Sequence, residues 1–304
     1  MDVGKISEGL KRAGYIPDQG LASALWLAEA LQRPLLLEGD AGVGKTSIAA
    51  AYAKMETRRL IRLQCYEGLD LQQAVYEWNY SRQLLEIQRS GAGKPSGDRA
   101  FDLFDRSFLL ERPLLQAISS TQPVVLLIDE IDRADEAFEA FLLEVLADFQ
   151  ITVPELGTIT ASSIPMVVLT SNGTRELSDA LRRRCLYHYV EYPTLSREIE
   201  IVKLRLPEAE TRLVEEAVAF VHKLRREDLH KVPGIAESLD WVRALHKLDL
   251  RGLPDEPELI LQTLGCMLKT KNDRWQVAAE TVDKLLGGER VGVTTGVAAG
   301  LARA

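Results

Sequence analysis

The chain has 304 residues, 46% of them hydrophobic and 27% charged, and a formal net charge of −8, which is ordinary for a globular protein large enough for two domains. The negative net charge gives no support to a nucleic-acid partner, although the net charge of a whole chain does not reveal a local basic groove. No apolar stretch is long enough for a bilayer, and the N-terminal residues MDVGKISEGLKRAGY lack the apolar core of a signal peptide, so we expect a cytoplasmic protein without a membrane span.

The first informative element is a strand, a glycine-rich loop and a helix. Pro34–Glu38 is short and apolar, as in a buried parallel strand, and the alanine-rich stretch Ser47–Met55 fits a helix. Between them, GDAGVGKT matches the phosphate-loop pattern, whose backbone N–H groups, lysine and threonine suit phosphates and magnesium. A chance glycine turn is the alternative, and the flanks favour nucleotide binding. The expected binding residues are Gly39, Asp40, Ala41, Gly42, Val43, Gly44, Lys45, Thr46 and Ser47.

A long stretch separates the second expected strand, Leu60–Gln64, from the third. Aromatic residues in this stretch could stack on single-stranded nucleic acid, which usually requires interleaved arginines or lysines. Acidic residues lie among them instead, so packing on the sheet is the favoured interpretation. The aromatic residues are Tyr66, Tyr76, Trp78 and Tyr80. A polar, glycine-containing loop at Ser90–Arg99 is expected to be mobile.

The third expected strand, Val124–Ile128, is fully apolar and is followed by Asp129 and Glu130. The carboxyl ends of parallel strands open on the ligand crevice. We therefore expect Asp129 to hold magnesium beside Thr46, and Glu130 to polarise an attacking water. An acidic pair at a helix start is the alternative. Because a kinase passes the phosphoryl group to a substrate hydroxyl, it has less use for a second carboxylate, and Glu130 favours hydrolysis.

The next features are a hairpin and a fourth strand. Ile151–Thr160 reads as two short strands around a tight turn, and Val167–Thr170 as an apolar strand that leads into Ser171 and Asn172. An amide at this strand end can hold the lytic water or sense the γ-phosphate. Serine and asparagine are also ordinary turn residues, and the two preceding motifs favour the functional interpretation.

Three arginines follow within Leu181–Cys185, before the last expected strand, Tyr187–Val190. Cations suit the C-terminus of a helix and need no further role there. The spacing behind Asn172 favours an arginine finger, which stabilises charge on the transferred phosphoryl group and normally comes from a neighbouring subunit. A finger therefore predicts a ring.

Strand signals stop after this point. The expected domains are an α/β core over residues 1–193 with an insertion at about 66–110, a helical domain over 194–287 and a flexible tail over 288–304. Three widely separated cysteines, Cys65, Cys185 and Cys266, predict reduced thiols, and the histidines have no metal-ligand spacing.

Together these elements resemble the AAA+ ATPases. The hairpin is similar to the pre-sensor hairpin of one AAA+ clade, and the long stretch before Val124 to the helix-two insertion of MoxR, magnesium chelatase and dynein-like proteins. Six sequence segments resemble the carbon monoxide dehydrogenase accessory (CoxD-like) branch of MoxR-type ATPases. They are RPLLLEGDAGVGKT, RLQCYEGLD, AVYEWNY, EAFLLEVLADFQ, VPELGTI and ALRRRCLYHYVEYP. The resemblance, from about residue 15 to 250, implies a P-loop AAA+ core with a parallel five-stranded sheet, the insertion and the hairpin, followed by an all-helical lid.

The resemblance also implies an activity and partners. It assigns catalysis to Lys45, Glu130, Asn172 as first sensor and Arg184 as finger, with Arg182 as the competing finger. ATP with Mg²⁺ would drive a ring, expected to be hexameric, that remodels a metalloenzyme client of the molybdenum carbon monoxide dehydrogenase type. The resemblance implies a partner protein with a von Willebrand factor A domain. It does not imply a nucleic-acid partner.

One residue departs from the family pattern. Ser238 occupies the place of the lid arginine that MoxR proteins usually carry, so the second sensor is absent or displaced. A DNA-acting motor, such as a helicase loader or restriction motor, remains an alternative. A nucleotide-gated scaffold with weak turnover is another.

Overall fold

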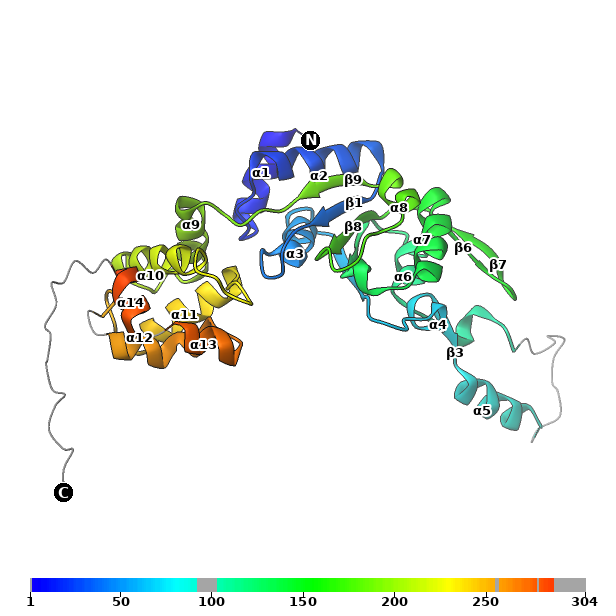
Figure 1. The fold of residues 1–304 in the computed structure, drawn as a ribbon. Coiled ribbons are helices and arrows are strands. Elements are labelled where there is room, and N and C mark those ends of the chain that lie inside the picture. The colour runs from blue at the N-terminus through cyan, green and yellow to red at the C-terminus, as the bar shows by residue number, and fades with distance from the viewer. Residues whose placement is uncertain (1, 92–102, 255–256, 278, 287–304) are drawn as a thin grey trace, which may run out of the picture. The chain divides into compact units, whose positions relative to one another are not determined.

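The structure is a computed structural model that describes residues 2–91, 103–254, 257–277 and 279–286 (Figure 1). It divides into two compact units, the first ending at Leu204 and the second beginning at Arg205. The expected tail at 288–304 and most of the loop expected at Ser90–Arg99 lie outside the described residues. The domain limits expected from the sequence remain a prediction.

A five-stranded parallel sheet forms the centre of the first unit, in the order β2-β5-β8-β1-β9. The strands are β1 Leu35–Glu38, β2 Arg59–Gln64, β5 Val124–Asp129, β8 Met166–Ser171 and β9 Leu186–Tyr189. β5 and β8 are buried along their whole length, which explains their continuous apolar sequence. This sheet confirms the fold class expected from the sequence, and each strand end lies within one residue of its expected position.

Helices cover both faces of the sheet (Figure 1). One face carries α1 Val3–Arg12, α2 Gln19–Leu31 and α3 Lys45–Met55, and the other carries α6 Pro113–Ile118, α7 Glu136–Asp148 and α8 Asp179–Arg184. Because successive strand residues point to opposite faces, Leu126 packs in one hydrophobic cluster and Leu127 in the other. The polar carboxyl ends of the strands are thereby left at one edge of the sheet.

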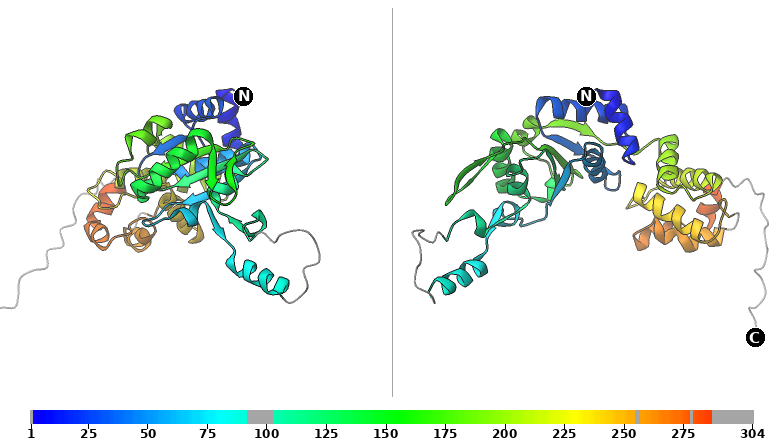
Figure 2. Two further views of the ribbon diagram at one scale, coloured as in Figure 1. Left: turned by 90° about the vertical axis from the view of Figure 1, so that its right-hand side faces the viewer. Right: turned by 180° about the vertical axis from the view of Figure 1, so that it is seen from behind.

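Two additions extend from this core (Figure 2). The insertion contains α4 Leu71–Ala74, β3 Tyr76–Trp78, α5 Tyr80–Gly91, the short 3-10 helix η1 Arg106–Phe108 and β4 Leu109–Glu111, with β3 and β4 antiparallel. The hairpin pairs β6 Gln150–Val153 with β7 Gly157–Thr160, as the sequence predicts. Trp78 is buried and packs edge-on against Tyr76 and Phe104, whereas Tyr66 and Tyr80 are exposed. Packing therefore accounts for only part of the aromatic cluster.

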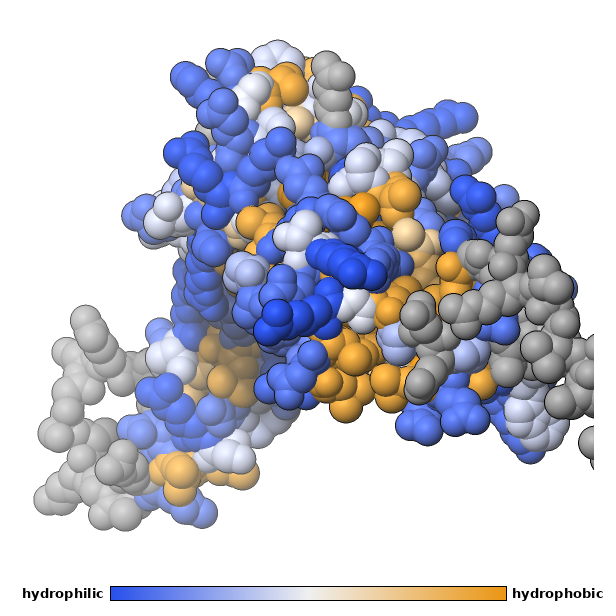
Figure 3. All heavy atoms as spheres, turned by 90° about the vertical axis from the view of Figure 1, so that its left-hand side faces the viewer, coloured by the Kyte–Doolittle hydropathy of each residue, from blue (hydrophilic) through white to orange (hydrophobic). Residues whose placement is uncertain are grey.

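The remaining described elements are helical. They are α9 Leu195–Arg205, α10 Thr211–Leu224, α11 Ile235–Lys247, α12 Pro257–Thr263, the 3-10 helix η3 Leu264–Cys266, α13 Lys271–Gln276 and α14 Ala279–Leu286. In the second unit, Trp241 is fully buried with its ring centroid 5.2 Å from that of Phe220, and its Nε1 donates to Thr263 Oγ1 at 2.9 Å. Figure 3 shows one face of the molecule, on which hydrophilic side chains predominate and hydrophobic areas are smaller. No helix in the described ranges is long and apolar enough to cross a membrane.

Asp18 connects several elements of the first unit. Its carboxylate caps α2 by accepting the Leu21 N–H at 2.6 Å, and it lies 3.7 Å from His188 Nε2 and 3.4 Å from Arg197 Nη1. His188 contributes most to lowering the pKa of Asp18 to about 2, with Leu21 and Arg197 adding to it and burial opposing it. Because the folded pKa is depressed, the charge stabilises the fold above the ordinary value of 3.8, and this contribution is lost as the pH falls towards 2.

Asp18→Asn is expected to lower the free energy of unfolding by about 1 kcal/mol at neutral pH, a value discounted for the partial exposure of Asp18. Asparagine keeps the helix cap, so the change removes mainly the charge. Urea unfolding at neutral and acidic pH measures the effect, with Asp2→Asn at the cap of α1 as the matched control. A difference between wild type and Asp18→Asn that does not shrink on acidification would contradict this account.

Candidate active site

The glycine-rich loop leaves β1 at the carboxyl edge of the sheet. A Cβ atom at Gly39 would lie 2.3 Å from the Val190 carbonyl oxygen, so only glycine lets the loop pass beside the end of β9. Gly42 and Gly44 have φ values of 84° and 96°, in the left-handed region that glycine adopts without strain. Gly44 provides no side-chain cap, so α3 begins at Lys45 with its first backbone N–H groups uncapped by a side chain. Such a helix start favours an anion.

Lys45 joins this loop to the end of β8. The side chain is 6% exposed, and its Nζ donates to the carbonyls of Gly39 at 2.6 Å and Asp40 at 2.7 Å and to Asn172 Oδ1 at 2.8 Å. Burial lowers the pKa of Lys45, while nearby carboxylates, with Asp132 first, act in the opposite direction. Two expected site residues that lie far apart in sequence are thus in direct contact. A phosphate would be a stronger acceptor for Nζ than these neutral oxygens.

Asp129 is the centre of the polar cluster. It is 2% exposed, and its Oδ1 accepts from Thr46 Oγ1 at 3.0 Å and from Thr170 Oγ1 at 2.5 Å. Its Oδ2 accepts from Arg62, through Nε at 3.1 Å and Nη2 at 2.5 Å. The structure therefore places the two expected magnesium ligands side by side.

The oxygens of Thr46 and Asp129 are hard donors of the kind that magnesium takes. Within the described residues there is no group of three His, Cys, Asp or Glu side chains that could hold a metal. A magnesium ion in a nucleotide site draws its other ligands from phosphates and water, so these two residues fit that ion.

Glu130 has an unusual backbone conformation. Its φ is 56°, in the left-handed region, which costs a non-glycine residue roughly 1–3 kcal/mol. The Glu130 N–H donates to Thr170 Oγ1 at 2.9 Å, and the carboxylate lies 3.1 Å from Arg133 Nε. Thr170 thus connects both carboxylate residues, because its hydroxyl also donates to Asp129.

Asp132 fixes the segment around Asn172. It is 3% exposed and accepts from the Asn172 N–H at 3.2 Å, and from the N–H and hydroxyl of Thr174 at 3.0 and 2.6 Å. Burial opposes the charged form, but the hydrogen bonds from Thr174 and Asn172 outweigh burial and lower the pKa of Asp132. The expected first sensor is therefore held through its backbone, while its side chain faces Lys45.

The helix that carries the arginines is held at both ends. At its start, buried Glu139 pairs with Arg175 and accepts the Ser178 N–H at 2.9 Å. At its end, Arg33 donates to the carbonyls of Arg183 at 2.6 Å and Arg184 at 3.1 Å. These contacts set the direction in which the arginine side chains leave α8.

The structure does not bring Arg184 to the other expected site residues. Its side chain is exposed, and Nη1 donates to the Leu143 carbonyl on α7 at 3.0 Å. Arg182, the competing finger, lies 3.6 Å from Glu38 at the end of β1. Ser238 is fully buried in α11, where its hydroxyl donates to the Gly234 carbonyl at 3.2 Å, so it provides no second sensor.

Several residues around the site were not singled out from the sequence. Arg62 gave no signal, because it lies on the exposed side of the edge strand β2, where a cation is common. Asp132, Arg175 and Glu139 had none, since charged residues of this kind are common on exposed turns and helices. Only the three-dimensional contacts show that Asp132 and Glu139 are buried.

Comparison with known proteins identifies the family of the first unit's domain. Residues 34–185, which are half of the chain, match the AAA domain family described as the dynein-related subfamily. Similar solved structures include the RuvB Holliday junction branch migration motor of Thermotoga maritima, at 18% identity and a TM-score of 0.44 over 85% of this chain and 68% of that chain. Two single-residue RuvB mutants give 19% and 17% identity and TM-scores of 0.47 and 0.48, over 90% of this chain and 72% and 71% of theirs.

Thr170→Val is expected to lower the free energy of unfolding by about 1–3 kcal/mol. Valine keeps the shape of the side chain but leaves the buried Asp129 carboxylate and the Glu130 N–H without the hydroxyl that serves both. Urea denaturation measures the loss, and Thr160→Val at the exposed end of β7 is the matched control. Equal stability of the two variants would show that this hydroxyl does not hold the site together.

Proposed function

The chain belongs to the dynein-related subfamily of AAA domains, and we propose that it is an ATPase that couples ATP hydrolysis to the remodelling of a client protein. The observation that carries the proposal is the meeting of Lys45, Asn172, Thr46 and Asp129 at the carboxyl ends of three neighbouring strands. A small-molecule kinase could share the nucleotide loop, but the second carboxylate, Glu130 beside the buried Asp129, favours transfer of the phosphoryl group to water.

Each residue of this site has a proposed role. The backbone of residues 39–47 and the Lys45 ammonium would hold the phosphate chain, and Thr46 and Asp129 would hold magnesium. Glu130 would accept a proton from the attacking water, which requires that its carboxylate leave Arg133. Asn172 would orient that water or report the presence of the γ-phosphate. Bound ATP supplies the phosphoryl group that is transferred to water.

Arg184 would act on the site of a neighbouring subunit, in a ring expected to be hexameric. Its exposure leaves it accessible to a neighbour, and its present acceptor, the Leu143 carbonyl, is neutral. Arg182 is paired with a carboxylate, from which a guanidinium leaves less readily. This difference favours Arg184 as the finger over Arg182.

The client is proposed from the resemblance to MoxR-type ATPases. It would be a metalloenzyme under maturation, of the molybdenum carbon monoxide dehydrogenase type, with a von Willebrand factor A domain protein as the partner that links it to the ring. A DNA-acting motor is the rival, and it would require turnover that rises with DNA and falls steeply with salt. A scaffold with weak turnover is the other rival, because Ser238 leaves the second sensor unassigned.

Glu130→Gln is expected to reduce ATP turnover by about 10²-fold or more while nucleotide binding is retained, because only the proton acceptor is lost. Steady-state phosphate release and binding of a fluorescent ATP analogue measure the two quantities. Glu136→Gln, an exposed carboxylate in the first turn of α7, is the matched control. Unchanged turnover in Glu130→Gln would remove the hydrolytic role.

Arg184→Ala is expected to abolish most turnover without preventing assembly, and Arg182→Ala to have a smaller effect. Turnover against protein concentration, with mass photometry on the same samples, measures both properties. Mixing Arg184→Ala with Glu130→Gln should restore part of the activity, because some interfaces then combine an intact glutamate with an intact arginine. Activity that is independent of concentration and of Arg184 would instead indicate a monomeric P-loop enzyme.

A further inference from the structure

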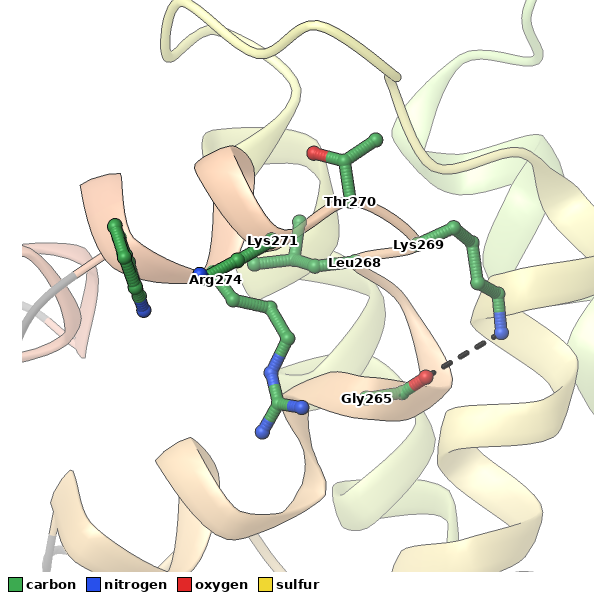
Figure 4. A pocket seen from close by; sticks show the side chains of 7 residues that line it. Gly265, Leu268, Lys269, Thr270, Lys271 and Arg274 are labelled. Atoms are coloured by element: carbon green, nitrogen blue, oxygen red, sulfur yellow. Dashed lines mark hydrogen bonds between the residues drawn. The ribbon is translucent and has the colours of Figure 1, made fainter.

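A hollow in the second unit is lined by cationic side chains and an exposed tryptophan (Figure 4). It lies between the turn at Gly265 and α13, and its volume is about 700 Å³. Lys269, Lys271 and Arg274 contribute the charges, and none of the other described residues that line it is charged. Three cations in one place are notable in a chain whose net charge is −8.

Among the residues that the structure describes, no acidic side chain forms an ion pair with these three cations. Arg274 extends into the hollow in Figure 4, and no carboxylate within the described residues pairs with it. The adjacent Asp273 is fully buried and faces inward, where it accepts the N–H groups of His230 at 2.7 Å and Lys231 at 3.2 Å. Lys269 donates through Nζ to the Gly265 carbonyl at 3.4 Å, which is a neutral acceptor. The local carboxylate is thus committed to the fold, and the positive charge remains available to a ligand.

Trp275 adds an apolar surface to this charge. Its side chain is 71% exposed, and the Lys271 ammonium lies 4.2 Å from the centre of its ring. A cation over an aromatic face is stabilised, so this pair holds a charge and an apolar surface together. Tryptophan and arginine are the residues that most often dominate the binding energy of protein interfaces. The exposed indole therefore favours a macromolecular segment over a free small anion.

We propose that this hollow binds an acidic segment of a partner protein, whose carboxylates pair with Lys271 and Arg274 and whose apolar side chain covers Trp275. The volume lies within the range of roughly 300–1,000 Å³ that is usual for binding sites and accommodates a few side chains. Nucleic acid is the less favourable occupant, because a phosphate backbone extends its charge far beyond three cations. This inference does not depend on the proposed ATPase mechanism.

Fluorescence anisotropy of labelled probes tests the proposal on the full chain. The probes are a dodecapeptide of aspartate, glutamate and two leucines, the same peptide with asparagine and glutamine in place of the acids, and an oligodeoxythymidylate. Wild type should bind the acidic peptide above the neutral one, and added salt should weaken that binding. Arg274→Glu and Trp275→Ala should each weaken it about five- to tenfold. Arg251→Glu, an exposed cation of the same unit outside the hollow, is the matched control.

Thermal unfolding and ATP turnover of the same variants separate a binding defect from a folding defect. Arg274 and Trp275 are exposed, so both quantities should stay at the wild-type level. Equal binding of the acidic and neutral peptides, or acidic-peptide binding that Arg274→Glu leaves unchanged, would overturn the proposal. Tighter binding of the oligodeoxythymidylate that is lost in Arg274→Glu would also overturn it and assign the hollow to nucleic acid.

Discussion

The buried carboxylate of Asp129 is the interaction on which the candidate site depends. A carboxylate that is 2% exposed is tolerated only when hydrogen bonds replace its water, and here Thr46, Thr170 and Arg62 provide them. These donors come from the helix after the loop, from β8 and from β2. One desolvated charge therefore holds together three parts of the chain that must keep their relative positions for nucleotide chemistry.

Two further buried carboxylates connect this site to the helix that carries the arginines. Asp132 holds the backbone of Asn172 and Thr174, and Glu139 holds Arg175 and the start of α8. The segment from Asn172 to Ser178 is thus fastened at two points to the chain that follows β5. A displacement of Asn172 would disturb the hydrogen bonds of both Asp132 and Glu139. These bonds therefore connect the nucleotide residues physically to α8.

The second unit has a different internal organisation. Its helices enclose an apolar core around Trp241, and the hydroxyl of Ser238 is buried within α11. Three of its cations line the hollow beside α13. The same unit therefore combines a buried apolar core with the exposed cationic hollow that we propose as a protein-binding site.

The amino-acid sequence by itself determined the strands of the sheet, the glycine-rich loop, and which strands end in polar residues. Continuous apolar runs identify buried parallel strands, and a glycine-rich loop of this spacing between a strand and a helix is typical of phosphate binding, so Lys45, Thr46 and Asp129 could be named in advance. Tertiary structure alone decided which side chains support them. Arg62, Glu139 and the contacts of Arg33 with α8 depend on residues that meet only after folding. The local pattern of apolar and polar residues predicts the secondary structure of a segment. The burial of a charged side chain and the choice of its partner depend on distant parts of the chain.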